Sequence, residues 1–334
     1  MRPKRLSCFW FASCLLAAIY FSAIAFHKYH LHRSLQLTQS LIWMKTRQWR
    51  NLTNICYKGY CGPWIEEFFQ DYFYMGGRAQ NIYIRRIFLP ISWTNCHLYC
   101  SEKQKMDLQE FLDNLDPAKQ YFTVIQIARG IHHHGLNLNI PDNINIVFFT
   151  CGGFNKGKMV RNVVLPLMKG NISKRNLSKK YPVSFVGSLD THEIRHDLYQ
   201  RYSNIVHFEQ TDNWKDIMEQ SYFTFAPRGF GPTSFRLFEA IRLGSVPIYF
   251  WEDDLLLPFQ EMISWETFSI VLSVTDVNSV IDVMMKADYE QMQESLTKVQ
   301  SFFTMEYMCS YIFDKLQGNF DYGTTHRHFH RFGT

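Results

Sequence analysis

Residues 183–250 alternate short apolar runs with segments of helical spacing, and this alternation restricts the fold more than any other feature. The pattern predicts strands at 183–186, 204–208, 222–226 and 246–250, separated by helices at 193–202, 212–220 and 233–243. Strands that alternate with helices of about ten residues pair in parallel, because each crossover helix returns the chain to the same end of the sheet. We therefore expect a doubly wound α/β sheet in this half, extended by a strand at 268–272 and a long helical stretch to Lys315.

The first half repeats the α/β pattern less regularly. It predicts helices at 64–73 and 105–115, and strands at 82–89, 121–127 and 144–149. A chain of 334 residues with 46% hydrophobic content can fill two cores. We expect two domains, 51–180 and 181–318, with a hinge in the basic stretch 169–182 and a tail at 319–334.

An uncharged apolar run extends from Leu6 to Phe26, long enough to cross a bilayer as a helix. It predicts a transmembrane signal anchor at 6–26, with a cytosolic tail at 1–5 and a stem at 27–50. A cleavable signal peptide is the alternative, because Ala23-Ile-Ala25 has the shape of a cleavage site. Both interpretations place the body in the lumen, and the anchor predicts a single-pass type II protein of the Golgi or endoplasmic reticulum membrane.

The positive charge is concentrated at the amino terminus. Residues 1–50 contain eight basic side chains and no acidic one, so the rest of the chain is slightly acidic. It has no arginine-rich run with interleaved aromatic residues, which argues against nucleic acid as a partner.

Sequons and cysteines agree with a lumenal body. N-glycosylation sequons begin at Asn51, Asn171 and Asn176. Outside the apolar run there are six cysteines, an even number that predicts disulfides in an oxidising compartment and leaves 15 pairings open. The six are Cys56, Cys61, Cys96, Cys100, Cys151 and Cys309. A zinc site built from the first four is the alternative.

A glycine-rich turn at 228–234 follows one predicted strand and opens the next helix. Ligands of open α/β sheets bind at such carboxyl ends, where unpaired helix N–H groups and the helix dipole attract phosphate. Gly229 and Gly231 let the backbone approach a ligand closely. The turn therefore predicts a diphosphate site.

The helix after this turn carries Arg236 and Glu239 on one arc. Arg228 and Arg236 can neutralise phosphate charge, and Glu239 can accept hydrogen bonds from ribose hydroxyls. A solvated arginine–glutamate face after a structural turn is the alternative.

The segment Pro227–Ile248, followed by Asp254–Phe259, resembles the carboxyl-terminal signature of the exostosin family, glycosyltransferase family 47. Ser184–Arg195 resembles the strand and turn that open the donor domain of that family. The segments 63–69 and 88–95 resemble segments of exostosin-like proteins more loosely.

This resemblance implies two Rossmann-like domains facing a cleft, the GT-B architecture. It also implies an inverting glycosyltransferase with a nucleotide sugar, a UDP-sugar by preference, on the carboxyl-terminal domain and a glycan or glycoprotein acceptor. Carried over to this chain, the nucleotide and diphosphate are held by Arg228, Ser234, Arg236 and Glu239, with Arg195 as a second phosphate contact.

We expect no cofactor, since arginines can stabilise the leaving diphosphate. Asp254 is expected to point toward the donor; a divalent ion held by 252–254 and a plain turn are the alternatives.

Inverting transfer needs a base for the acceptor hydroxyl. His132 and His133 follow a predicted strand and should border the cleft, and Glu67 or Glu66 is a further candidate. Three other possibilities stay open: a non-catalytic partner subunit or glycan-binding module, a GDP-sugar enzyme such as a fucosyltransferase, and an oligomer with another transferase.

Overall fold

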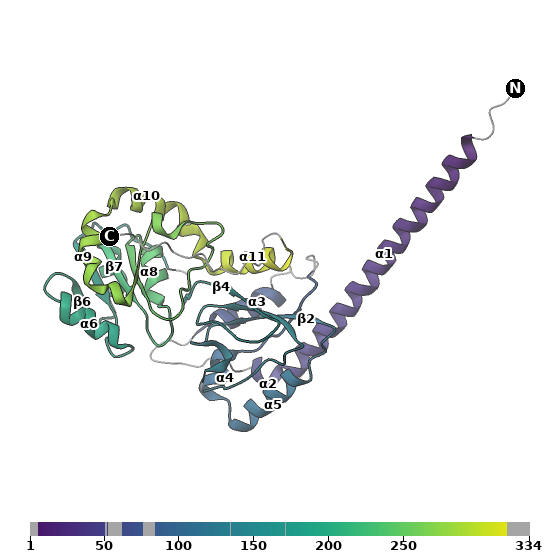
Figure 1. Ribbon diagram of the computed structural model, residues 1–334, viewed down its shortest axis with the longest axis horizontal. Helices are drawn as coiled ribbons and strands as arrows, with labels where there is room; N and C mark the ends of the chain where they lie inside the picture. Colours follow the sequence, from purple (N-terminus) through teal and green to yellow (C-terminus); the bar gives the residue numbers. More distant parts are fainter. Residues whose placement is uncertain are drawn as a thin grey trace.

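The computed structural model describes residues 6–50, 52, 62–75, 84–133, 135–170 and 172–318, with side chains from Tyr20 onward. Two α/β halves lie side by side, and a long amino-terminal helix projects from the first (Figure 1). Both sheets are entirely parallel, which confirms the predicted α/β class.

The first sheet has the strand order β1-β2-β3-β4. Its strands are β1 (Ile87–Phe88), β2 (Gln120–Ile125), β3 (Asn145–Thr150) and β4 (Val160–Val164). The helices of this half are α3 (Ile65–Met75), α4 (Trp93–Tyr99) and α5 (Glu102–Asp113). Successive side chains of a strand point to opposite faces, so Phe122 packs in the core with α3, while Tyr121 packs in the core with α5.

The second sheet has the order β6-β5-β7-β8-β9. Its strands are β5 (Tyr181–Val186), β6 (His207–Glu209), β7 (Ser221–Pro227), β8 (Val246–Trp251) and β9 (Ile270–Ser273). Between the strands lie α6 (Glu193–Tyr202), α7 (Trp214–Glu219) and α8 (Phe235–Leu243). Every strand and helix predicted for 183–250 is present, with ends shifted by a few residues.

The predicted helical stretch that ends at Lys315 is broken into shorter helices. These are α9 (Val280–Lys286), α10 (Tyr289–Val299) and α11 (Met305–Leu316). Asp288 and Thr304 cap the amino ends of α10 and α11, because each side chain accepts a hydrogen bond from a backbone N–H of the first turn.

Helix α11 returns to the first half. Phe313 contacts Phe69 and Phe73 of α3, and the largest core cluster contains residues of both sheets. The two halves are therefore joined by a shared hydrophobic core as well as by the linker.

The segment expected as a stem is helical and partly packed. Helix α1 (Leu6–Lys45) continues into the short α2 (Arg47–Arg50), and Ile42 is buried with the first sheet. Gln39 hydrogen-bonds both the N–H and the C=O of Phe88, at 2.8 and 3.0 Å, and so occupies the outer edge of β1. Within the strand predicted at 82–89, the described part contains the two-residue strand β1. The outer edge of β1 is bonded by a helix side chain, Gln39, rather than by another strand.

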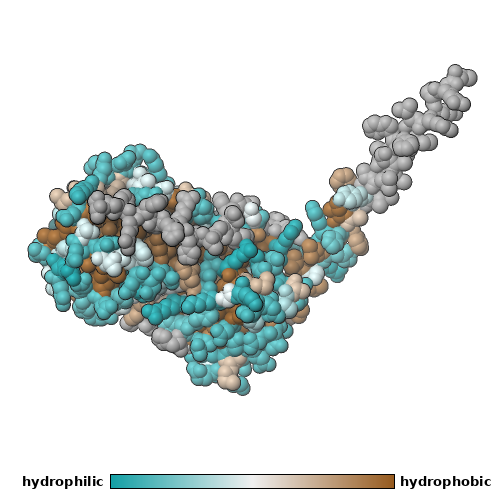
Figure 2. All heavy atoms as spheres, in the orientation of Figure 1, coloured by the Kyte–Doolittle hydropathy of each residue, from teal (hydrophilic) through white to brown (hydrophobic). Residues whose placement is uncertain are grey.

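Helix α1 exposes apolar side chains where it leaves the body, including Leu37, Leu41 and Met44 (Figure 2). Within the residues whose side chains are described, no helix has the length and hydropathy needed to cross a membrane. The side chains of 6–19, most of the predicted anchor, lie outside that part.

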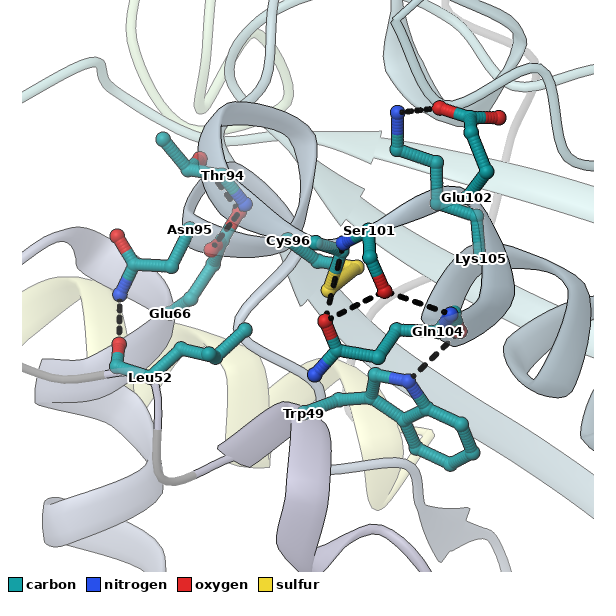
Figure 3. The surroundings of a disulfide bond; sticks show 11 residues. Trp49, Leu52, Glu66, Thr94, Asn95, Cys96, Ser101, Glu102, Gln104 and Lys105 are labelled. Carbon is teal, nitrogen blue, oxygen red and sulfur yellow. Dashed lines mark hydrogen bonds and ion pairs between the residues drawn. A yellow bond between two sulfur atoms is a disulfide. The ribbon is translucent and has the colours of Figure 1, made fainter.

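Cys96 and Cys100 form a disulfide across one turn of α4 (Figure 3). Cys151 and Cys309 are buried and free. The paired Cys96 and Cys100 overturn the zinc alternative, since a disulfide leaves no thiolate ligands. The predictions for residues 1–5, Asn51, Cys56, Cys61, Asn171 and 319–334 concern residues outside the described part of the chain.

Candidate functional site

The candidate site lies where the strand order of the second sheet reverses. Strand β5 has β6 on one side and β7 on the other, so the chain leaves the carboxyl ends of β5 and β7 in opposite directions. Ligands of open α/β sheets bind in the crevice at this switch point. The loop 187–192 follows β5, and the turn 228–234 follows β7, as the sequence predicts.

The turn leads directly into helix α8. Ser234 is the N-cap, and its hydroxyl accepts from the Arg236 N–H at 3.2 Å. Gly229 N–H donates to the Thr233 carbonyl at 3.4 Å and closes the turn on itself. Gly244 ends the helix at φ 73°, a left-handed conformation that favours glycine.

Gly231 brings this turn against the carboxyl edge of the first sheet. A Cβ on Gly231 would lie 3.1 Å from the Ala128 Cβ and 3.4 Å from the Gly152 carbonyl oxygen, in the loops after β2 and β3. The close approach that the structure shows at Gly231 is to the other half of the protein, and the predicted approach to a ligand stays a prediction. The carboxyl edges of the two sheets consequently face each other.

Arg195 holds the two loops of the switch point together. Its Nε donates to the Arg228 carbonyl at 2.9 Å, and its Nη1 donates to the Ser188 carbonyl at 2.8 Å. Burial and the charge of Arg236 lower its pKa to about 10. These bonds give Arg195 a positioning role, and its predicted phosphate contact stays a prediction.

Arg228 is 1% exposed and forms ion pairs with two acids that follow β8. Its Nη1 contacts the carboxylates of Glu252 and, at 2.9 Å, Asp253. His192, the N-cap of α6, approaches the same Glu252 at 3.5 Å through Nε2, while its Nδ1 accepts from the Ile194 N–H. In this structure Glu252 and Asp253 therefore offset the positive charge of Arg228.

The surroundings of His192 favour the neutral form of its imidazole. Burial lowers its pKa first, followed by the positive charges of Arg228 and Arg195, against the opposing effect of Glu252 and Glu193. A proton on Nδ1 would also point at the backbone N–H of Ile194, from which this nitrogen accepts a hydrogen bond.

Arg236 and Glu239 lie one turn apart on α8, as the helical projection predicts, and form an ion pair. Arg236 also donates to the Val186 carbonyl at the end of β5, and its guanidinium lies 4.9 Å from the Trp214 ring centroid. Burial lowers the pKa of Lys169, whose charge interacts with Glu239 and Arg236. The alternative of a solvated helix face is wrong for Glu239, which is 3% exposed.

Four polar atoms in or next to this turn are buried without a hydrogen-bond partner among the described residues: Thr191 Oγ1, Arg228 Nε, Thr233 Oγ1 and Glu239 Oε1. A buried polar atom without a partner is destabilising by about 1–3 kcal/mol, and such atoms are rare in native proteins. Thr191 Oγ1 would lie 3.6 Å from a Cβ on Gly229. Donors and acceptors that lack partners at a switch point are what a polar ligand would satisfy.

Asp254 points back toward the first half. Its carboxylate accepts from the Phe154 N–H, in the loop after β3, and its pKa is raised by burial and by Asp253. Among the residues that the structure describes, no group of three His, Cys, Asp or Glu side chains is arranged to hold a metal ion.

The histidine loop lies at the facing edge of the first sheet. His132 Nε2 accepts from the Lys156 N–H at 2.9 Å, in the loop that Asp254 contacts. His133 Nδ1 accepts from the Gly135 N–H at 3.1 Å, and its ring packs on His97. The structure thus connects His132 to the donor half through hydrogen bonds.

Glu66 and Glu67 lie at the start of α3. Figure 3 shows Glu66 beside Thr94 of α4. Glu67 accepts from the Trp64 N–H at 3.0 Å and from Asn95 Nδ2. Glu66, 1% exposed, accepts from the Thr94 N–H and hydroxyl and from the Gln126 N–H, and burial raises its pKa to about 8. Glu66 therefore links two backbone segments, whereas Glu67 links the Trp64 backbone to the Asn95 side chain.

Sequence reasoning did not identify Thr191, His192, Trp214 or Lys169 as parts of this site. Thr191 and His192 belong to the segment Ser184–Arg195, which resembles the family as a whole and does not single out either residue. Trp214 and Lys169 come from segments with no motif, and only the fold brings them to α8.

Residues 138–287 match the family model described as Exostosin GT47 domain. A probable glucuronosyltransferase of Oryza sativa subsp. japonica is 28% identical over 129 residues, which are 36% of this chain and 30% of that protein. An Exostosin-1 homolog of Caenorhabditis elegans is 32% identical over 88 residues, which are 26% of this chain and 23% of that protein. The matches therefore span less than a third of these relatives.

Among solved structures, an alpha-glucosyltransferase in complex with UDP and a 13-mer DNA containing a central A:G mismatch has a TM-score of 0.40 at 11% sequence identity. The alignment covers 65% of this chain and 76% of that one. A likeness this distant carries no argument about this chain.

Proposed function

From the premise that this chain belongs to the exostosin GT47 family, we propose that it is an inverting glycosyltransferase that uses a nucleotide sugar. The facing carboxyl edges of its two sheets are the donor and acceptor sides of a GT-B site. The donor is a UDP-sugar, and the acceptor is a glycan or glycoprotein.

The observation that carries this proposal is the group of buried atoms without partners around the turn. Thr191 Oγ1 and Arg228 Nε can donate to phosphate or sugar oxygens, and Glu239 Oε1 can accept from a ribose hydroxyl. The start of α8 adds the positive end of a helix dipole. Together they supply donors for a diphosphate and one acceptor for a sugar hydroxyl.

The arginines stabilise the negative charge that develops on the leaving diphosphate. The reaction then needs no metal, and Asp254 orients the donor. His132 is the base we favour among the candidates, because its loop touches the loop that Asp254 contacts.

We further propose that the body lies in the lumen of the Golgi or endoplasmic reticulum, attached through the amino-terminal helix. The Cys96–Cys100 disulfide supports this location, because structural disulfides are rare in the cytosol.

Thermal stabilisation by a panel of nucleotides and nucleotide sugars tests the donor site. A ligand at about 100 times its dissociation constant stabilises the native state by about 2.7 kcal/mol. We expect UDP and at least one UDP-sugar to raise the melting temperature, and Arg236→Ala and Glu239→Gln to abolish that rise. Release of the nucleoside diphosphate from the same sugar then measures transfer.

Two exposed helical ion pairs provide matched controls. Arg201→Ala on α6 and Glu294→Gln on α10 make the same replacements away from the turn, and should leave the stabilisation unchanged. If no nucleotide stabilises the wild type, the chain is a non-catalytic subunit. Stabilisation by GDP alone would instead indicate a GDP-sugar enzyme.

A further inference from the structure

Asn176 is the first residue of a sequon, Asn176-Leu-Ser178, which plays no part in the proposed transfer reaction. The residue is exposed and adopts φ 60°, in the left-handed region that asparagine tolerates better than most residues. Its amide has no hydrogen-bond partner among the residues that the structure describes. Asn176 is therefore the outward tip of a tight turn.

A buried carboxylate fixes this turn on both sides of Asn176. Glu219 is 2% exposed and accepts from the N–H of Arg175 at 2.9 Å and from the N–H of Leu177 at 3.0 Å. The Arg175 side chain forms an ion pair with Asp216 on the same helix, α7. With its neighbours on either side bonded inward, the Asn176 side chain is left facing solvent.

A lysine ties the same segment to the body. Lys179 Nζ donates to the carbonyls of Glu219, Ser221 and Gly244, at 3.0, 2.7 and 2.6 Å. Ser221 begins β7, and Gly244 ends α8, so these bonds lie at the amino edge of the second sheet. The donor site is at the carboxyl edge, and a large group on Asn176 would leave it open.

We propose that Asn176 carries an N-linked glycan. Asn176 Nδ2 attacks the anomeric carbon of an oligosaccharide held on a polyprenyl diphosphate. The N–C bond forms, the C–O bond to the diphosphate breaks, polyprenyl diphosphate leaves, and the amide proton passes to a base of the modifying enzyme. The proposal rests on the lumenal location given above, and is independent of whether this chain is itself a transferase.

The test uses the full chain expressed in insect cells, in an Asn51→Gln/Asn171→Gln background that leaves Asn176 as its remaining natural sequon. A sequon added after Thr334 reports whether the carboxyl-terminal body reaches the lumen. We expect two glycans, both removed by peptide N-glycosidase, and mass spectrometry should find an aspartate at position 176 after that treatment. Asn176→Gln and Ser178→Ala should each lose one glycan, whereas Ser178→Thr should keep both.

The reporter separates the ways in which the proposal can fail. If the reporter is glycosylated and Asn176 is not, the lumenal location holds and the proposal is wrong. If neither is glycosylated, the body is not lumenal, and the proposal fails with that location. Thermal stabilisation by UDP, measured on the same preparations, keeps the donor site a separate question.

Discussion

Replacing Gln39 tests whether helix α1 is part of the folded body or only a tether. Its side-chain amide bonds both backbone groups of Phe88 and also donates to the Tyr74 hydroxyl at 2.8 Å. A side-chain amide has the same donor and acceptor as a peptide group, so Gln39 acts as a neighbouring strand for β1. We expect Gln39→Ala to destabilise the whole first sheet.

The size of the effect follows from those two bonds to Phe88, which is 1% exposed. Each hydrogen bond contributes about 1 kcal/mol net, and a buried group left without a partner raises the loss toward about 1–3 kcal/mol. We therefore expect Gln39→Ala to lower the free energy of unfolding by about 2–4 kcal/mol.

Gln36→Ala is the matched control, because Gln36 is exposed on the same helix and its side-chain amide hydrogen-bonds only His32 among the described residues. Both variants change helix propensity equally, so the difference between them isolates the hydrogen bonds that Gln39 makes to Phe88 and Tyr74. Urea denaturation of the purified chain, followed by tryptophan fluorescence, measures both. If Gln39→Ala and Gln36→Ala differ by less than about 0.5 kcal/mol, α1 is not a structural part of the sheet edge.

Two further predictions concern the switch point. The fold lowers the pKa of His192, so its contribution to stability is full above the usual histidine pKa near 6.5 and is lost as the pH falls through and below that pKa. His192→Asn keeps a helix cap and should remove this loss of stability at low pH. Denaturation of both proteins at about pH 7.5 and about pH 5.5 measures the difference. Gly231→Ala should destabilise the chain by about 1–3 kcal/mol by pressing on Ala128, and the double variant Gly231→Ala/Ala128→Gly should recover most of that loss in the same assay.

The regular half of the fold could be predicted because one local pattern determines it. Between 183 and 250 each strand is an apolar run and each helix has its own period, and parallel pairing follows from the alternation. The turn at 228–234 was found at the carboxyl end of its strand for the same reason. Strand β4 and helix α4 were missed, since Val160–Val164 mixes polar and apolar residues and Trp93–Tyr99 is a short helix without a clear apolar face.

The partners of the charged side chains could not be predicted. A helical projection pairs Arg236 with Glu239, because both lie on one helix. It says nothing of Glu252 and Asp253, which reach Arg228 only once β7 and β8 pair. Likewise, Gly231 reads as a phosphate-binding glycine in sequence, while its contact with Ala128 depends on how the two halves pack.

These ion pairs predict how the site would respond to a diphosphate. Asp253 is 60% exposed and can turn to solvent, whereas Glu239 is 3% exposed and stays beside Arg236. Phosphate must therefore compete with Asp253 for Arg228. Removing that competitor with Asp253→Asn should tighten UDP binding by about 0.3–1 kcal/mol, which is about two- to fivefold, while Glu239→Gln weakens it.

Asp190, 85% exposed in the neighbouring loop and paired with His196, controls for long-range charge, since Asp190→Asn removes the same charge without touching Arg228. Isothermal titration with UDP compares the three variants. Equal tightening by Asp253→Asn and Asp190→Asn would show that the change in overall charge accounts for the effect, and Arg228 would then not be the group that exchanges an acid for phosphate.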